Sequence, residues 1–489
     1  MHQIIFRTLL LLSAALVTLT VLRAAERDPI EGRWLTETGT PDNLARVGLE
    51  ISRNDQDALV IHYTIDLVNF HRVPLPAPLH RVADGRYAIP AYQMELTLEH
   101  ERLRVTELLD EPLVLRRVDQ LPQPRVRPEW PRGSAPRWQV ALGGEIFAAP
   151  AVRDGFAYVG TTHGVLFALN IADGARLWTF AAGRPIHSEA VTTEDAVFFT
   201  CDNGFLFRLQ RADGKEVWRY DLGDARVSRI PPNPFVFDYD HRGATPLLLD
   251  GVLYVGAADG GFHAVNVATG ERVWRAELGG KIRTQAAAHG ANLIVGTLAK
   301  RLVALDRATG REIWSVADKG AVTSSPAIAG DVAIVGSRGA LLRGIDARSG
   351  TELWSQNWFG SWVESSAVLH EGRAYIGSGD LFLVSEFDPA TGRNLWRTHV
   401  YGWVLNRPAV TDEFVYVGVS GAKRRPTTFL KQAGGVTALH RTTGEVAWHW
   451  PSAENAGSFL HGVMAPPVVA GDTLLAAGVD GTFSAFPLR

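Results

Sequence analysis

One short acidic stretch holds residue types that could bind a metal. The segment "DYDH" at 238–241 offers carboxylate oxygens from Asp238 and Asp240 and an imidazole nitrogen from His241. The two Asp have the alternate spacing of calcium-loop ligands, but no complete calcium-binding loop follows them. The stretch is therefore a candidate ligand site, with a solvated loop as the more ordinary interpretation.

Motifs of the common catalytic centres are absent from the sequence. The 15 His show no HExxH-type spacing, and neither a GxSxG nucleophile motif nor a P-loop occurs. The single Cys, Cys201, lies in the apolar run "AVFFTCDNG". No intrachain disulfide can form, and a buried, unreactive thiol is expected. The sequence thus gives no direct indication of an enzyme.

The N-terminus has the features of an export signal. Arg7 supplies a positive charge, residues 9–22 are apolar, and the small Ala24 and Ala25 precede a charged segment. This apolar run of about 14 residues is shorter than the roughly 20 needed to span a bilayer. We expect a cleaved signal over residues 1–25, no membrane span afterwards, and a periplasmic or secreted protein. No Cys lies near the cleavage point, which disfavours a lipid anchor.

The net charge of the chain argues against one class of partner. The formal charge is −3, and removing the two Arg of the signal makes it −5. A nucleic-acid-binding protein would carry a basic face, so nucleic acid is not expected as a partner. The net charge does not indicate whether the chain forms oligomers.

A repeat of Gly, three residues, then Trp organises most of the chain. "ATGERVW" at 268–274 recurs as "ATGREIW" at 308–314, "RSGTELW" at 348–354 and "ATGRNLW" at 390–396. The period of about 40 residues is typical of a propeller blade of four short strands. The Gly is expected at a turn with positive φ, and the Trp is expected to cover the gap between neighbouring sheets. The aligned residues are Trp138, Trp178, Trp218, Trp274, Trp314, Trp354, Trp396 and Trp448.

The two ends of the repeat region predict how the propeller closes. A last unit begins near Met464, but the chain stops at Arg489 before any Trp. Its missing fourth strand is predicted around Trp138, so that both ends of the region build one blade and no blade is left open. The prediction is an all-β fold with an eight-bladed propeller over residues 137–489.

The segment before the propeller lacks the repeat. Residues 26–120 contain several alternating strand patterns and are predicted to form a small antiparallel barrel or sandwich of about six to eight strands. Their "GRWLTE" at 32–37 resembles the opening of lipocalin-like barrels. Residues 121–136 hold five Pro and are predicted to be a semi-rigid linker.

The repeat itself resembles a known family. "ALDRATGREIW" (304–314), "AVNVATGERVW" (264–274) and "ALHRTTGEVAW" (438–448) resemble the tryptophan-docking motif of quinoprotein-type, pyrroloquinoline-quinone-like repeats. That family includes quinone-dependent dehydrogenases and a non-enzymatic propeller of the outer-membrane β-barrel assembly machinery, and the chain looks closer to the latter. The dehydrogenases imply a quinone and Ca²⁺ at the propeller axis. Many also carry two adjacent Cys, which this chain cannot supply.

Two insertions are expected to decorate one face of the propeller. Residues 221–243 lie between blades, and residues 419–434 lie between a second and a third strand, so both fall on the same face. Functional loops on a rigid scaffold commonly gather in this way. Aromatic and Arg residues of such a face are candidates for partner binding, although the Trp could equally be core residues at the channel mouth. These candidates are Trp358, Trp362, Trp403, Arg424, Arg425 and His461.

Polar residues also occur where the innermost strands begin. Alternate positions there should point to the axis, but the sequence does not show which of the two sets does so. The candidates are His187, Arg283, Gln285, Glu364, Asn406 and Arg407. We expect an exported scaffold that binds a protein partner, periplasmic or in the outer membrane, with no cofactor. The alternatives are a pyrroloquinoline-quinone-dependent oxidoreductase with Ca²⁺ and a glycan-binding accessory protein.

Overall fold

The structure is a computed structural model. It describes residues 27–38, 45–66, 70–75, 77–107, 112–123, 126–223, 240–358, 361–422, 432–453 and 460–488. The predicted signal over residues 1–25 lies outside these ranges. The chain divides into two compact units, one within residues 1–124 and the other from residue 125 onward.

The N-terminal unit is a single nine-stranded antiparallel sheet, one strand more than the upper end of our estimate. The strand order is β4-β3-β2-β1-β9-β8-β7-β6-β5, and a bridge between Leu59 and Leu79 brings the chain before β5 back to β3. One 3₁₀ turn, η2 (Pro90–Tyr92), precedes β7. The strands are β1 (Gly32–Thr38), β2 (Ala45–Arg53), β3 (Leu59–Ile65), β4 (Phe70–Pro74), β5 (His80–Ala83), β6 (Arg86–Ile89), β7 (Met94–Glu99), β8 (Arg102–Val105) and β9 (Leu113–Val118).

The "GRW" of β1 has a packing role in this unit. Trp34 is fully buried, and its indole N–H donates to the Ile30 carbonyl at 2.9 Å. Arg117 lies 4.3 Å above the Trp34 ring and donates to the Glu31 carbonyl. Gly32 has φ +143° and a Cβ there would lie 2.4 Å from the Arg117 guanidinium, so another residue would strain the backbone and displace that side chain.

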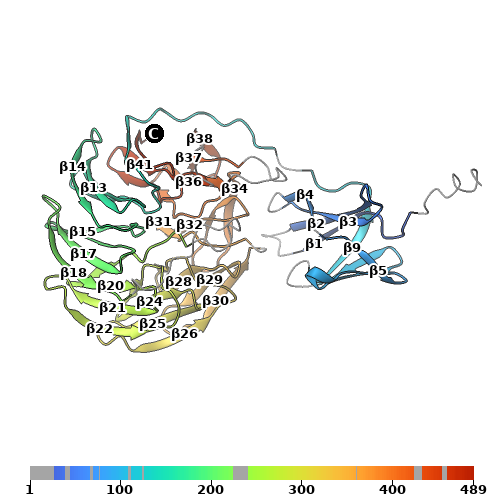
Figure 1. The fold of residues 1–489 in the computed structure, drawn as a ribbon, viewed down its shortest axis with the longest axis horizontal. Coiled ribbons are helices and arrows are strands. Elements are labelled where there is room, and N and C mark those ends of the chain that lie inside the picture. Colours follow the sequence, from blue (N-terminus) through green and yellow to red (C-terminus); the bar gives the residue numbers. More distant parts are fainter. Residues whose placement is uncertain are drawn as a thin grey trace, which may run out of the picture. The chain divides into compact units, whose positions relative to one another are not determined.

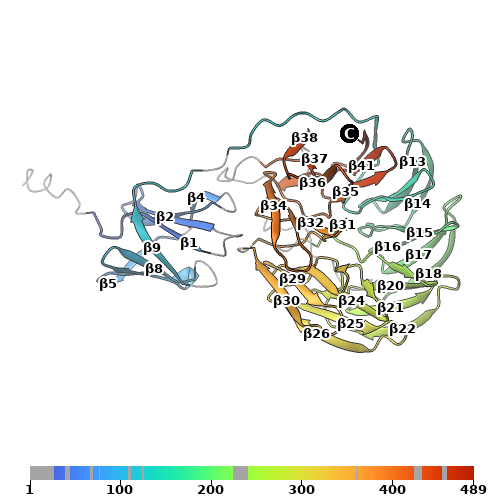
Figure 2. The ribbon, with the colours of Figure 1, turned by 180° about the vertical axis from the view of Figure 1, so that it is seen from behind.

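The second unit is an eight-bladed β-propeller, as the repeat predicts (Figures 1 and 2). Seven blades are built from consecutive strands. Their innermost strands are β11 (Ala151–Arg153), β15 (Val191–Thr192), β19 (Leu247–Leu249), β23 (Ala287–His289), β27 (Ala327–Ala329), β31 (Val368–His370) and β35 (Ala409–Val410). The second strands are β12 (Phe156–Gly160), β16 (Ala196–Thr200), β20 (Val252–Gly256), β24 (Asn292–Thr297), β28 (Val332–Gly336), β32 (Arg373–Gly377) and β36 (Phe414–Ala422).

The two outer positions of these blades follow the same order. The third strands are β13 (Val165–Asn170), β17 (Phe205–Gln210), β21 (Gly261–Asn266), β25 (Arg301–Asp306), β29 (Leu341–Asp346), β33 (Leu383–Phe387) and β37 (Gly435–His440). The outermost strands are β14 (Arg176–Ala181), β18 (Glu216–Asp221), β22 (Arg272–Glu277), β26 (Glu312–Ala317), β30 (Glu352–Asn357), β34 (Asn394–His399) and β38 (Val446–Pro451). An extra strand, β39 (Leu460–Gly462), pairs with the end of β36.

The eighth blade is shared between the two ends of the propeller region, as predicted. It consists of β40 (Val468–Ala470), β41 (Thr473–Ala477), β42 (Thr482–Pro487) and, as its outermost strand, β10 (Trp138–Ala141). The register places Trp138 opposite Ala485. Arg137 adds a forked ion pair to Asp472, with distances of 3.0 and 2.7 Å.

The repeated Trp joins each blade to the next one. In six of the eight, the indole N–H donates to a carbonyl of the following blade, as from Trp138 to Ile171 at 2.9 Å and from Trp274 to Arg307 at 3.0 Å. The turn Gly of that following blade lies against the ring. At Gly310, φ is +72° and a Cβ would lie 2.5 Å from the Trp274 ring. This position therefore requires Gly for two reasons. The backbone has a positive φ, as predicted, and a side chain would occupy the space of the docked Trp.

The last docking Trp receives its Gly from the predicted linker. Trp448 of β38 packs against Gly133, where a Cβ would lie 2.5 Å from the ring. Along the same edge, the His449 N–H donates to the Pro131 carbonyl at 2.9 Å and the Gly133 N–H donates to the His449 carbonyl at 3.2 Å. Trp130 packs edge-on against His449. This stretch of the linker is thus a fixed strap on the outermost strand of the seventh blade.

No helix within the described residues has the length and apolar character that a membrane crossing requires.

Candidate functional site

The residues that precede each innermost strand form one mouth of the axial channel. The residues four and two before the strand face the channel, as His187 and Glu189 do before β15 and Arg283 and Gln285 do before β23. Of the two alternating sets that the sequence left undecided, the set four and two residues before the strand therefore belongs to the mouth. They come from rigid blades, so their side chains start from fixed points.

The residue three before the strand points into its own blade instead. The Ser188 hydroxyl donates to the Thr200 carbonyl at 3.0 Å, and the Thr284 hydroxyl donates to the Gly296 carbonyl at 3.0 Å. Asn406 occupies this position in the seventh blade. Its amide donates to the Gly418 carbonyl at 2.8 Å, so although it borders the cavity its N–H₂ group is engaged in tying strands together.

Hydroxyl groups link neighbouring blades around the mouth. The backbone N–H of Gln285 donates to the Ser325 hydroxyl at 2.9 Å, and the backbone N–H of Ser325 donates in turn to Ser366 at 2.9 Å. The backbone N–H of Glu189 donates to Thr245 at 3.3 Å. These bonds hold adjacent blades in register where the channel opens.

The end of the first insertion runs into this mouth. Asp240 is buried and receives a bidentate pair from Arg283 at 3.0 and 2.8 Å, with the Lys281 ammonium at 3.5 Å. Two residues on, Arg242 donates to the backbone carbonyl of Glu364 at 2.7 Å and to that of Leu405. The segment 240–243 therefore reaches blades on both sides of the axis. The rest of the insertion, including Asp238, lies outside the described residues.

A second charged group stands next to this segment. The Glu364 carboxylate, almost fully buried, accepts from Arg338, and the His241 Nε2 lies 4.0 Å away. Burial alone would raise the pKa of Glu364, but the charges of Arg338 and Arg242 outweigh it and lower the pKa. Burial lowers the pKa of His241 to about 3, so this imidazole is neutral at neutral pH. Asp240 is the other described candidate of the "DYDH" stretch. Its carboxylate forms an ion pair with Arg283 instead of facing a metal site.

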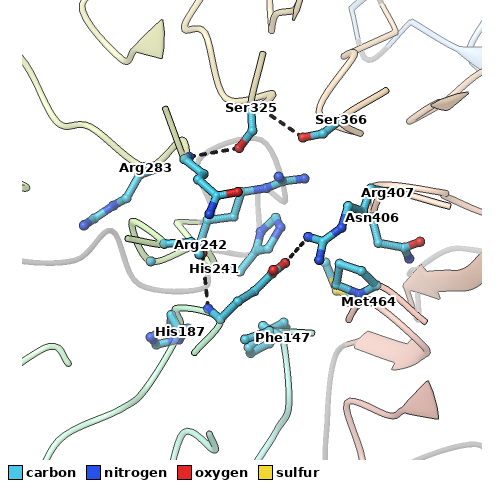
Figure 3. Close-up of a pocket in the computed structure, with 16 residues that line it drawn as sticks. Phe147, His187, His241, Arg242, Arg283, Ser325, Ser366, Asn406, Arg407 and Met464 are labelled. Atoms are coloured by element: carbon cyan, nitrogen blue, oxygen red, sulfur yellow. Dashed lines mark hydrogen bonds and ion pairs between the residues drawn. The ribbon is translucent and has the colours of Figure 1, made fainter. Parts of the chain in front are cut away.

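The cavity at the mouth is small and cationic. It has a volume of about 60 Å³, which is enough for a few water molecules. Figure 3 shows Arg242, His241 and Arg407 reaching toward its centre, with Phe147 and His187 below them. Arg407 forms an ion pair with Glu189 across the channel. The ring of Phe147 stacks on His187 at 5.8 Å between centroids.

Two of the three predicted face tryptophans are buried, so the interpretation of an exposed aromatic rim is wrong for them. Trp358 is fully buried, and its indole donates to Gln356 at 3.0 Å. Trp403 is 4% exposed and donates to Asp380 at 2.8 Å. Only Trp362 is half-buried, with Arg338 stacked 4.4 Å above its ring.

Trp403 belongs to an apolar wall on one side of the channel mouth. It packs there with Phe147, Phe382, Leu460, Met464 and Val479. No local sequence pattern predicts this wall, because its members come from four blades.

The remaining candidates divide between described and undescribed residues. His461 of β39 is buried, with its Nε2 3.4 Å from the Gln432 carbonyl. Arg424 and Arg425 lie outside the described residues. The 419–434 insertion does connect β36 and β37, the second and third strands of its blade, as predicted.

Glu189, Arg242 and Arg338 are mouth residues that the sequence analysis missed. Glu189 could have been found from its place two residues before β15, which matches that of Gln285 and Arg407. Arg242 and Arg338 lie outside the alternating register, and their positions follow only from the three-dimensional structure.

One group in the described part of the chain has side-chain atoms spaced for a metal. His370, Glu371 and Asp412 offer ligand atoms within 4.8 Å of one another. However, His370 and Asp412 already form a pair at 3.0 Å, and Glu371 pairs with Arg441 at 2.9 Å. They lie at turns between first and second strands, away from the channel mouth.

Together these features define a class, a tryptophan-docked eight-bladed propeller with a polar axial mouth. The model of one protein family, described as outer membrane protein assembly factor BamB, matches residues 132–229, 180–281, 259–358 and 337–425. These matches run from residue 132 to residue 425, more than half of the 489 residues. The chain belongs to this family of outer membrane protein assembly factor BamB.

Individual relatives are more distant. Outer membrane protein assembly factor BamB of Yersinia pestis is 25% identical over 142 residues, which cover 29% of this chain and 36% of that protein. The chain thus spans about a third of the length of the curated relative it matches.

Solved structures show the fold. BamB from Moraxella catarrhalis aligns at a TM-score of 0.50 with 16% identity, over 72% of this chain and 96% of that one. Quinohemoprotein alcohol dehydrogenase from Comamonas testosteroni aligns at 0.53 with 15% identity, over 72% and 76%. Sqt1 from Saccharomyces cerevisiae aligns at 0.56 with 12% identity, over 73% and 99%. Because an assembly factor and an enzyme share this fold, the fold does not decide the activity.

The residues at the mouth do not fit the quinone and Ca²⁺ of the dehydrogenases. A cavity of about 60 Å³ is too small for a three-ring quinone, and the segment 240–243 fills the adjacent part of the channel. The carboxylates that could bind Ca²⁺ already pair with Arg side chains, Asp240 with Arg283 and Glu364 with Arg338. The adjacent Cys pair of many such enzymes is ruled out by the single Cys.

Proposed function

We propose that this chain is an exported, non-enzymatic scaffold that binds a protein partner through the face bearing the two insertions, in the assembly of outer-membrane proteins. The observation that carries the proposal is that the described residues flanking both insertions lie on the same face of a rigid propeller as the polar channel mouth. Membership of the BamB family supports the assembly role. The proposal includes a periplasmic location and no resident cofactor.

The geometry of the blades explains why this face suits a partner. Loops between blades and turns between second and third strands touch one another there, as where the Thr162 N–H donates to the Glu145 carbonyl at 3.0 Å. A partner could contact several blades at once, and the blades would change little on binding because they are locked by Trp docking and hydroxyl bonds. Such preorganisation lowers the entropic cost of association.

The two alternatives from the sequence receive less support. The quinone-dependent oxidoreductase requires a cofactor that the mouth residues do not fit. The glycan-binding interpretation rested on exposed aromatic side chains, and Trp358 and Trp403 are buried.

A rescue experiment tests the proposal. The gene is deleted in its host, and outer-membrane protein levels are measured. Rescue is then compared between the wild-type chain and a variant with Arg184→Glu and Lys300→Glu, two exposed residues on the mouth face. Charge reversal there should weaken association, so this variant should restore outer-membrane protein levels only partly.

The matched control carries Lys215→Glu and Arg348→Glu, exposed residues at turns on the opposite face. It should rescue as well as the wild-type chain. Equal rescue by both variants would show that the mouth face is not the binding surface. Unchanged outer-membrane protein levels in the deletion strain would reject the assembly role.

A further inference from the structure

Cationic side chains outnumber carboxylates at the channel mouth. A second cavity adjoins the one described above, because His241, Arg242 and Arg283 line both of them. Among the described residues that line the two cavities, four are Arg and two are carboxylates, a difference of two positive charges. The ion-pair partners behind them, Lys281, Glu364 and Asp202, add one positive and two negative charges. Leaving the two His out of the count, one positive charge remains. The six lining residues are Arg242, Arg283, Arg338, Arg407, Glu189 and Asp240.

In sequence, the neighbouring segments together carry no net negative charge. Residues 224–239 contain two Asp and two Arg, residues 423–431 contain four Lys or Arg and no acid, and residues 454–459 contain one Glu. Their sum is three positive charges. An excess of positive charge in a partly buried site is unfavourable unless an anion accompanies it.

The cavity offers both space and donors for such an anion. Arg242 and Arg407 line the same space, and the side chain of Arg407 is 38% exposed, so an anion can reach it from solvent. The amide of Gln285 and the hydroxyls of Ser325 and Ser366 complete the polar side of the lining. A volume of about 60 Å³ admits one carboxylate or phosphate group but not a larger organic ring system.

We infer that the axial mouth is an oxyanion-binding site, in which Arg242 and Arg407 bind a single carboxylate or phosphate group. Arg is suited to this because its planar guanidinium forms paired hydrogen bonds to such groups. The Glu189 carboxylate already pairs with part of the Arg407 guanidinium. The inference deepens the proposed function, because an acidic side chain of a partner carries the same chemical group as a free anion.

Crystals soaked in bromide test the site without any partner. Anomalous diffraction should show a bromide in the cavity between Arg242 and Arg407. Absence of a bromide from the cavity, in crystals that bind bromide elsewhere, would overturn the inference.

Two variants with opposite expected effects test the residues. Titration calorimetry with inorganic phosphate in chloride-free buffer measures the dissociation constant. Arg407→Met removes a charged donor and should weaken binding at least tenfold. Glu189→Gln removes the carboxylate that competes for Arg407 and should strengthen binding several-fold. Arg348→Met, an exposed change on the opposite face, should leave it unchanged.

Shifts in the same direction for Arg407→Met and Glu189→Gln would overturn the inference, because loss of fold explains equal weakening but not opposite effects. If Arg407→Met does not fold, the test depends on Glu189→Gln alone. An unchanged phosphate affinity of the Glu189→Gln variant would then overturn the inference.

Titrations with phosphate, acetate and a capped Gly-Asp-Gly peptide distinguish the source of the oxyanion. Binding of the free anions alone indicates a small-molecule ligand, and binding of the peptide indicates an acidic side chain. Either result supports the site, and binding of none of the three overturns it. The rescue experiment above is independent, so a failed anion site and a failed partner face give different results.

Discussion

At the scale of single residues, the repeated Gly is the clearest link between sequence and fold. Sequence reasoning explains it by a turn with positive φ. The structure adds that the neighbouring blade's Trp ring occupies the space of the missing Cβ. Two Gly of the fourth blade separate these causes, because both have positive φ but only one touches a Trp.

Gly310→Ala should therefore destabilise the propeller more than Gly290→Ala. Gly310 has φ +72° and a Cβ would lie 2.5 Å from Trp274, whereas Gly290 has φ +57° and no atom within 4 Å of its Cβ position. Strained φ costs about 1–2 kcal/mol at each site. Overpacking adds about 1–3 kcal/mol at Gly310 alone. Chemical denaturation measures the difference, and equal losses would show that the Trp contact is not a constraint.

Trp403→Ala should cost about 3–5 kcal/mol, as expected for a large buried aromatic. The side chain is 4% exposed and bonded to Asp380, so its loss leaves a cavity and a half-buried carboxylate with one partner fewer. The loss of stability is compared with that of Trp274→Ala, which removes a docking Trp. A loss below about 1 kcal/mol at Trp403, typical of surface positions, would restore it as a candidate face residue.

At the scale of elements, the closure of the ring depends on one short strand and the strap before it. β10 supplies the outermost strand of the eighth blade, and Gly133 supplies the Gly against which Trp448 docks. The sequence predicted β10 from the missing last Trp. It predicted a linker rather than a strap, because Pro-rich segments show no periodicity.

Removing residues 1–145 should lower the unfolding temperature of the propeller, because β42 and Trp448 then lose their partners. Removing only residues 26–120 should leave that temperature nearly unchanged. Differential scanning calorimetry of the two truncated chains checks this. If both unfold at the same temperature, the shared blade does not contribute to stability.

At the scale of the whole molecule, buried His residues make the fold sensitive to acid. Burial is the main cause that lowers the pKa of His241 to about 3 and those of His263 and His449 to about 4. An unfolded His titrates near 6.5. The unfolded chain therefore binds more protons than the folded one below about pH 6.5, and stability falls as pH drops toward 4.

Each such His should contribute up to about 1.4 kcal/mol of destabilisation per pH unit in this window. Urea unfolding at pH 7, 6, 5 and 4 measures the slope. His263→Gln should reduce it, because one of the three groups no longer titrates. A slope that does not change in this variant would show that His263 is not protonated on unfolding.

The sequence predicts the frame better than it predicts the site. Blade number, insertions and closure follow from the spacing of Gly and Trp, because one local geometry repeats. The mouth does not repeat: Arg242 reaches Leu405 across the channel, and Trp403 finds Asp380 23 residues away in the chain. Such contacts depend on how the blades are arranged, and no local pattern encodes them.

The proposed function requires that the insertion-bearing face binds the partner. A photo-crosslinking amino acid placed at Lys300 on that face, or at Ser349 on the opposite face, tests it in living cells. We expect a discrete adduct with an outer-membrane assembly protein at position 300, at several times the yield at position 349. Equal yields, or an adduct only at position 349, would contradict it.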